Sequence, residues 1–227
     1  MQPQLMKGVM APVVFVLCAL GSLTFGSSTV RAEVYAGGQL GFTIPEAFSN
    51  VVNDGGGFRF SNLDLNNAIA YGAKAGFYSE QYKWLGVETD LYTATPHLEG
   101  QTATRTDGGS TSVSVPGALT RVTTWAFSVM ARHPGEKFQP YAGIGIGLNF
   151  AKASGAFSRD TDTSPGVHLV GGLRMFVNKE VALFTEYKYD RATFRFRDLD
   201  NGPGGGTGFV GDYAGHTLMA GISFHLF

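Results

Sequence analysis

The feature that most constrains the fold is an alternation of apolar with polar or small residues, which recurs in eight runs along the chain. Successive side chains of an extended strand point to opposite faces, so a period of two indicates β-strands rather than helices. Most runs have about the 9–11 residues that a tilted strand needs to cross a membrane. The runs are residues 34–44, 69–79, 84–94, 123–132, 140–151, 166–177, 181–194 and 216–227.

The connections between these runs alternate in length. Short connections follow the second, fourth and sixth runs, whereas the others are long and rich in Gly, Ser, Thr, Asn and Asp, which predicts flexible, exposed segments. The long connections are residues 45–68, 95–122, 152–165 and 195–215. Short periplasmic turns, long external loops and an even strand number are typical of an outer-membrane barrel. We therefore predict an all-β fold, an up-and-down, eight-stranded antiparallel transmembrane β-barrel with both termini periplasmic; a soluble β-sandwich is the alternative.

Each run has one apolar and one polar or small face. We expect the apolar set to face lipid; it includes Leu85, Val87, Leu91, Trp125, Phe127, Leu169 and Leu173. The opposite face would then point into the barrel, whose eight strands leave an interior just wide enough for side chains to fill. It predicts an interior charge network of Lys74, Glu88, Asp90, Arg132, His168, Arg174, Glu186, Lys188 and Asp190.

The predicted network balances four acids against four bases, besides its histidine. Buried charges must be paired, so this balance favours a filled interior over a selective pore with one sign in excess. A turn centred on Gln81 would place Lys74 directly opposite Glu88. A turn centred on Lys179 would place His168 opposite Asp190, and Glu186 one diagonal from Arg174.

The N-terminus predicts an export signal over residues 1–32, with the barrel domain over residues 33–227. Lys7 precedes an apolar stretch that is short for a transmembrane helix, and Val30 and Ala32 suit cleavage before Glu33. A lipoprotein site at Cys18 fits less well, because bulky Leu17 precedes it. Cys18 is the only cysteine, so the cleaved chain would have no disulfide and no cysteine metal site.

Four segments carry a resemblance to a known group of proteins: "AEVYAGGQLGFT", "PYAGIGIGL", "LFTEYKYD" and "AGISFHLF". Over essentially the whole cleaved chain, this sequence resembles the small outer-membrane β-barrel proteins of the OmpA-like and opacity-type superfamily. The resemblance implies a bacterial outer-membrane location in a Gram-negative organism. It also implies a terminal aromatic signal for the barrel-assembly machinery, here Phe224 and Phe227. Phe227 is out of phase with the lipid-facing residues, so it lies past the strand or a bulge shifts it.

Partners follow from location and charge. Arg191, Arg195 and Arg197 leave the membrane with the seventh run and are candidates to contact lipopolysaccharide phosphates, or they form an ordinary basic strand end. The Gly-rich loops are candidates to bind a host ligand, a phage or a neighbouring barrel, or they are simply solvated. The cleaved chain is mildly acidic, which argues against nucleic acid. We expect a monomer that meets periplasmic chaperones, the assembly machinery, outer-membrane lipid and lipopolysaccharide.

No catalytic pattern stands out. The five histidines are scattered without metal spacing, and no His–Ser pairing is recognisable. Ser128 and Ser223 have inward parity but no paired base in the sequence. We therefore predict no enzyme, no catalytic site, no metal and no cofactor. The predicted role is envelope integrity or surface interaction; the alternatives are a small channel for small polar or hydrophobic solutes and a lipid A-modifying enzyme.

Overall fold

The computed structural model describes residues 32–53, 59–60, 64–98, 100–106, 109–115, 118–155, 160–196 and 209–227. They belong to one compact unit, Arg31–Phe227. The predicted signal segment lies outside the described residues except for Ala32, and Arg197 lies outside them too. In this part of the chain no helix is long and apolar enough to cross a membrane.

The described residues form thirteen strands. They are β1 (Glu33–Pro45), β2 (Ser49–Asn53), β3 (Arg59–Phe60), β4 (Ala68–Tyr78), β5 (Leu85–Ala94), β6 (His97–Leu98), β7 (Gln101–Thr106), β8 (Ser110–Val115), β9 (Ala118–Arg132), β10 (Phe138–Gly155), β11 (Asp160–Phe176), β12 (Val181–Phe196) and β13 (Phe209–Leu226).

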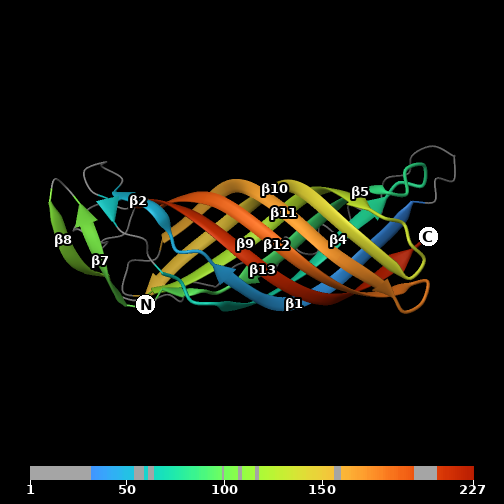
Figure 1. The fold of residues 1–227 in the computed structure, drawn as a ribbon, viewed down its shortest axis with the longest axis horizontal. Coiled ribbons are helices and arrows are strands. Elements are labelled where there is room, and N and C mark those ends of the chain that lie inside the picture. Colours follow the sequence, from blue (N-terminus) through green and yellow to red (C-terminus); the bar gives the residue numbers. More distant parts are fainter. Residues whose placement is uncertain are drawn as a thin grey trace, which may run out of the picture. The chain divides into compact units, whose positions relative to one another are not determined.

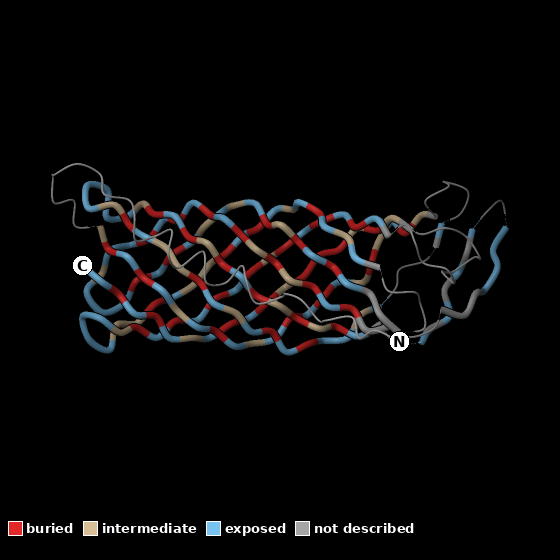
Figure 2. The backbone as a smooth tube through the Cα atoms, turned by 180° about the vertical axis from the view of Figure 1, so that it is seen from behind, coloured by how far each residue is buried: buried red, intermediate tan, exposed pale blue. Residues whose placement is uncertain are grey.

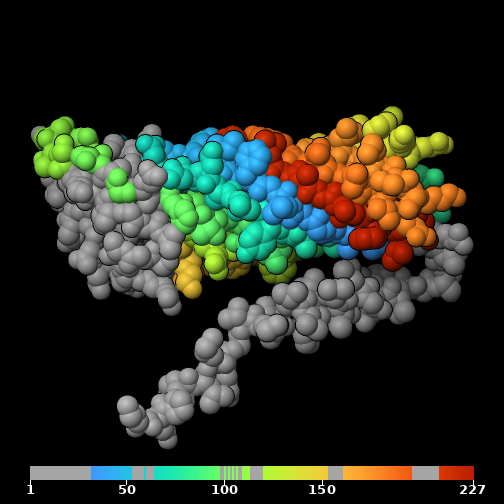
Figure 3. All heavy atoms as spheres, turned by 90° about the horizontal axis from the view of Figure 1, so that it is seen from below, coloured from blue at the N-terminus to red at the C-terminus, as the bar shows by residue number. Residues whose placement is uncertain are grey.

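Eight of these strands close into an antiparallel barrel. The neighbours follow the order β1, β4, β5, β9, β10, β11, β12 and β13, and β13 returns to pair with β1 along twelve residue pairs (Figure 1). In the space-filling view the strands cross the surface as oblique bands, with blue β1 beside red β13 (Figure 3). The predicted eight-stranded barrel is therefore confirmed.

The two ends of the barrel differ. Residues 79–84, 133–137 and 177–180 make short turns at one end, which we call the turn end. The first residue of β1 and the last of β13 also lie at this end, because Val34 pairs with Leu226. The opposite end, called the loop end, carries β2, β3, β7 and β8 (Figure 1).

Burial alternates along every barrel strand, as the sequence predicted (Figure 2). On β12, for example, Phe184, Glu186 and Lys188 are buried, whereas Thr185 and Tyr187 between them are exposed, as is Leu183 before them. The residues predicted to face lipid all lie on the outer wall, since each has outward parity and is at least partly exposed. A one-residue slip would invert every side chain, so the alternation determines which face is inside.

The strands extend further toward the loop end than the alternation indicated. β10 and β11 stay paired out to Ala153 and Asp160, inside the segment predicted to be a flexible connection. Backbone hydrogen bonds continue the ladder there even though the side chains no longer alternate clearly. The long connection between β5 and β9 also contains a hairpin, in which β7 pairs with β8 over six residue pairs.

β2 continues the position of β1 beside β13 after a local break. Glu46 donates its backbone N–H to the carbonyl of Ala214 at 2.8 Å, and the register of the β2–β13 pair shifts between Val210 and Asp212. Asn50, one of the two β2 residues that face Gly211 in this bulge, has a φ of 52°. Asn tolerates this left-handed conformation better than most residues, which fits it to a bulge.

Interior glycines permit the tight curvature of the wall. A Cβ built on Gly41 would lie 1.8 Å from the carbonyl oxygen of Leu218, and one on Gly145 would lie 2.0 Å from that of Phe127. Both contacts are with backbone, which cannot give way as a flexible side chain would. Glycine is therefore required where neighbouring strands approach so closely inside the barrel.

The register differs from prediction at one turn. Lys74 lies directly opposite Asp90, and Glu88 lies opposite Gly76 instead of Lys74. The turn is centred one residue later than Gln81, which moves each partner by two positions. A shift of two preserves the face of every side chain, so these residues still point inward as predicted, and Lys74 still reaches Glu88 across the diagonal.

The register at the other turn is as predicted. His168 lies opposite Asp190, and Glu186 lies opposite Gly172, one diagonal from Arg174. Phe227 follows the end of β13, and no register shift interrupts the pairing of β13 with β1. Phe227 is therefore out of phase with the lipid-facing residues because it lies just past the strand, and not because a bulge shifts it.

Candidate functional site

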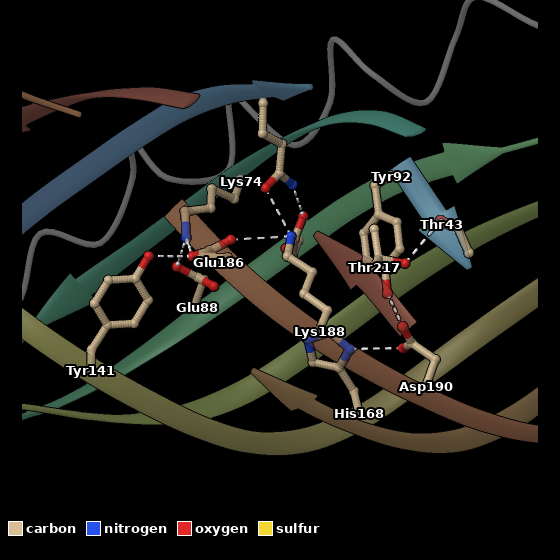
Figure 4. A network of polar contacts seen from close by, with 12 residues as sticks. Thr43, Lys74, Glu88, Tyr92, Tyr141, His168, Glu186, Lys188, Asp190 and Thr217 are labelled. Carbon is tan, nitrogen blue, oxygen red and sulfur yellow. Dashed lines mark hydrogen bonds and ion pairs between the residues drawn. The ribbon is translucent and has the colours of Figure 1, made fainter. Parts of the chain in front are cut away.

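The charged interior begins with a cluster around Lys74 at the middle of the barrel. Its ammonium group lies 2.9 Å from Oε2 of Glu88 and also contacts Oε1 of Glu186 (Figure 4). Each carboxylate also accepts a hydrogen bond from a tyrosine hydroxyl: Tyr35 donates to Glu88 at 2.6 Å and Tyr141 donates to Glu186 at 2.5 Å. All five side chains are buried, so the cluster joins opposite walls of the barrel through its interior.

Lys188 extends this cluster toward the loop end. It contacts Oδ2 of Asp90, and its ammonium lies 3.3 Å from Oε2 of Glu186. Gln39 links the same groups, since it donates to Asp90 at 2.6 Å and accepts from Lys188 at 2.8 Å. Two lysines and three carboxylates therefore form one connected network.

A second polar layer lies beyond Lys188. The Nδ1 atom of His168 is 2.8 Å from Oδ1 of Asp190, whose other oxygen accepts from Tyr92. On the same level, Thr124 donates to Asn149 at 2.8 Å. Figure 4 shows Tyr92, His168 and Asp190 of this layer beside the Lys188 side chain. Each of these side chains has a polar partner from another strand, although Nε2 of His168 has none among the described residues.

The turn end has its own polar layer. Arg132 lies 2.6 Å from Oε2 of Glu33, and it donates to Gln139 at 3.1 Å. His225 Nδ1 lies 2.8 Å from Oε1 of Glu33, while its Nε2 lies 2.8 Å from Oγ of Ser223. Salt bridges and hydrogen bonds thus tie the first residue of β1 to β9 and β13.

The pairing of Ser223 with His225 corrects the expectation that no such pair exists. Together with Glu33 they form a serine–histidine–carboxylate chain, the connectivity of a hydrolase triad. Ser223 and His225 are both fully buried, however, and a nucleophile must be reachable by its substrate. These three residues could not be grouped from the sequence, because Glu33 and His225 stand at opposite ends of the barrel domain.

Arg174 is the exception among the predicted interior charges. It is fully buried, yet none of its guanidinium nitrogens has a hydrogen-bond partner among the described residues. Its Cζ atom instead lies 4.4 Å from the ring centroid of Tyr35 and 5.1 Å from that of Tyr141. The diagonal to Glu186 therefore produces no ion pair, and aromatic faces surround this cation.

The structure thus places all nine predicted residues inside the barrel; six of them form ion pairs, and His168 and Asp190 share a hydrogen bond. In the described part of the chain, no three His, Cys, Asp or Glu side chains gather where they could hold a metal ion. A groove of about 490 Å³ lies on the outer wall, where Leu40, Leu173, Tyr187 and Leu218 line it. The interior chemistry is therefore that of mutual charge satisfaction between strands.

Comparison with known proteins places this geometry in a family. The family described as "Outer membrane protein beta-barrel domain" matches residues 14–224. The chain belongs to this family. It is therefore an integral β-barrel protein of the outer membrane of Gram-negative bacteria, and lipid surrounds its apolar wall. No curated protein sequence matches it.

Solved structures support the fold. The outer membrane protein OprG from Pseudomonas aeruginosa is 16% identical, with a TM-score of 0.53 over 87% of this chain and 97% of OprG. Neisserial surface protein A is 14% identical, with a TM-score of 0.50 over 87% of this chain and 99% of its own. At these identities the likeness establishes the barrel and does not transfer a function.

The residues predicted at the rim of this outer-membrane barrel have separate positions. Arg191 lies on the outer wall of β12, and its guanidinium is 3.9 Å from Oδ2 of Asp212. Arg195 is exposed on the same strand, and Arg197 lies outside the described residues. At the turn end, Phe224 and Phe227 are both exposed.

A polar cluster on the outer wall was not predicted from the sequence. Tyr187 lies 2.5 Å from Nδ1 of His216, and Nε2 of His216 lies 2.9 Å from Oε1 of Glu46. Tyr189, directly opposite His216, packs against its ring with centroids 5.2 Å apart. Periodicity could place Tyr187 and His216 on neighbouring strands, but Glu46 follows β1 and meets them only through barrel closure.

Proposed function

We propose that this protein is a monomeric barrel closed to solutes, which serves envelope integrity or surface interaction through its loop end. The observation that carries the proposal is the connected network of Lys74, Glu88, Glu186, Lys188 and Asp90, contributed by three strands. Buried charges in mutual contact resist separation, because parting them would leave each one desolvated and unpaired. A solute would have to displace these contacts to pass.

Conductance in planar lipid bilayers tests this proposal. We expect the refolded protein to give no reproducible single-channel steps, because the network occupies the interior. A general porin of the outer membrane, handled in the same way, provides the positive control. Regular steps that vanish when the protein is heat-denatured would overturn the closed barrel in favour of a small channel.

The loop end supports a role at the cell surface. β2, β3, β7 and β8 extend the sheet beyond the barrel strands, and this extension contains paired backbone. Such a platform could present loops to a host or phage ligand. Replacing Gln101–Val115 by a short Gly-Ser linker should abolish adhesion or phage adsorption by cells, if they show either, and leave the barrel folded.

Export and assembly follow from the two ends of the sequence. We propose cleavage before Glu33, passage to the outer membrane with periplasmic chaperones, and recognition of Phe227, with Phe224, by the assembly machinery. Deleting Phe227 should lower the amount in the outer membrane and leave refolding in detergent unchanged. Normal cellular levels after the deletion would exclude Phe227 from the signal. N-terminal sequencing of the purified protein tests the cleavage site.

Hydrolysis of an acyl ester is a second candidate function, favoured by the Ser223–His225–Glu33 chain. The burial of these three residues supports a structural role instead, in which their hydrogen bonds hold the ends of β1 and β13 together. A fluorophosphonate probe should therefore leave Ser223 unlabelled in the folded barrel. Labelling that disappears in Ser223→Ala and His225→Gln would establish a reactive serine, and lipid A mass spectrometry would then identify the product.

A further inference from the structure

Two cations face each other on the outer wall near the loop end. Arg121 on β9 and Lys152 on β10 are direct partners in the antiparallel register. Both side chains are exposed, and both have the outward parity of Trp125 and Phe150 on the same strands. The outer wall therefore carries a concentrated pair of positive charges at this point.

This arrangement is unfavourable unless an anion joins it. Like charges directly opposite each other on neighbouring strands repel, because their Cβ atoms are only about 4.5–5.5 Å apart. Neither the Arg121 nor the Lys152 side chain forms an ion pair or hydrogen bond with any described residue. Arg191, by contrast, has the carboxylate of Asp212 close by. The pair on β9 and β10 is thus the better candidate for an external anion.

The height of the pair on the wall indicates which anion it meets. Lys152 follows Phe150 by two residues and Arg121 precedes Trp125 by four, so both cations lie on the loop-end side of these outward aromatic residues. Each residue advances about 3.3 Å along a strand, so both charges lie just beyond the hydrocarbon boundary. Trp125, which donates to Thr89 at 2.9 Å, is typical of that interface.

We propose that Arg121 and Lys152 bind a phosphate group of lipopolysaccharide in the outer leaflet. Arg presents a planar fork that suits two phosphate oxygens, and Lys adds a compact charge from the neighbouring strand. One phosphate between them converts mutual repulsion into two attractions. The inference rests on the outer-membrane location of the proposed function and is independent of the closed interior, which conductance tests separately.

Native mass spectrometry of the purified folded barrel tests the site, with phosphorylated lipid A and enzymatically dephosphorylated lipid A as the two probes. We expect the wild-type barrel to retain the phosphorylated form with roughly tenfold or greater preference, since charge-assisted contacts are the strong ones. Arg121→Gln combined with Lys152→Gln should abolish the preference. The matched control combines Lys137→Gln with Lys179→Gln at the turn end and should keep it.

A third variant separates binding from folding. Lys152→Glu places a carboxylate opposite Arg121, so it should fold at least as well as the wild type and still lose the preference for phosphate. Equal retention of both lipids by the wild type would overturn the proposal, as would an intact preference in the double variant. Complete competition by millimolar inorganic phosphate would also overturn it, in favour of a site for a free anion.

Discussion

Lys74 and Arg174 are two fully buried cations in the same barrel, and they are satisfied in different ways. Lys74 contacts two carboxylates, each of which also accepts from a tyrosine. Arg174, nearer the turn end, lies among tyrosine rings and makes no hydrogen bond with the described residues. The comparison teaches that inward parity places a charge inside the barrel but does not provide its partner.

The difference should appear most clearly when Lys74 is removed. We expect Lys74→Met to destabilise the barrel by about 3–5 kcal/mol, because Glu88 and Glu186 lose a buried counter-ion. Urea-dependent unfolding from lipid vesicles measures the effect. Adding Glu88→Ala should recover part of the loss, since Glu186 retains Lys188. If the double variant simply summed two independent penalties, the contact between Lys74 and Glu88 would be wrong.

The next largest effect concerns the lipid-facing side of β11, next to Arg174. Leu173 is exposed to lipid although it precedes a buried arginine. Arg at the bilayer midplane on the lipid face costs about 2–4 kcal/mol, so Leu173→Arg should hinder folding into bilayers. A rim substitution, Thr163→Arg, is the control and should fold normally. Equal folding of the two variants would contradict the assignment of faces.

Removing Arg174 should have a smaller effect than either change. Arg174→Met loses contacts with aromatic faces but relieves the cost of burying an unpaired charge, and apolar replacements of buried ionic groups are often neutral or stabilising. We expect the free energy of unfolding to fall by no more than about 1–2 kcal/mol, the size of the lost cation–π contacts, and relief of the unpaired charge opposes even this loss. A loss as large as that from Lys74→Met would show that Arg174 has a strong partner after all.

The smallest effect lies outside the membrane, where Asp212 holds β2 to the barrel. Hydrogen bonds from Asn50 at 2.9 Å and Thr193 at 2.7 Å lower the pKa of Asp212. This stabilisation is present above the unfolded pKa of about 3.9 and is lost as the pH falls through the lower folded value. Hydrogen-exchange protection of β2 should therefore decrease on acidification while that of β12 persists.

The variant Asp212→Asn provides the control for this pH effect. It cannot titrate, so its β2 protection factors should show no step over the same acidic range. Equal pH dependence in the variant and the wild type would assign the change to another group. Both measurements compare the wall inside the bilayer with the extension beyond it.

Much of the fold was predictable because its signal is local. Alternation placed Glu186 and Lys188 inside and Leu183 and Tyr187 outside, and it needed only the geometry of an extended chain. The register at Lys74 could not be predicted, because a turn centred one residue later moves every cross-strand pair by two; Lys74 still contacts the predicted Glu88, but across a diagonal. The loop-end extension escaped as well, since backbone pairing of β10 with β11 continues where the side-chain pattern fades.

The sequence by itself therefore determined the number of barrel strands, the face of each side chain and nine of the ionisable residues inside, although Glu33 was missed. Tertiary structure decided which of these charges meet. Closure brings Glu33 to His225 and Arg132, whereas the register of the β9–β10 hairpin sets Arg121 opposite Lys152. The physical reason is that parity is a property of each strand alone, whereas a contact between charges requires the relative position of two.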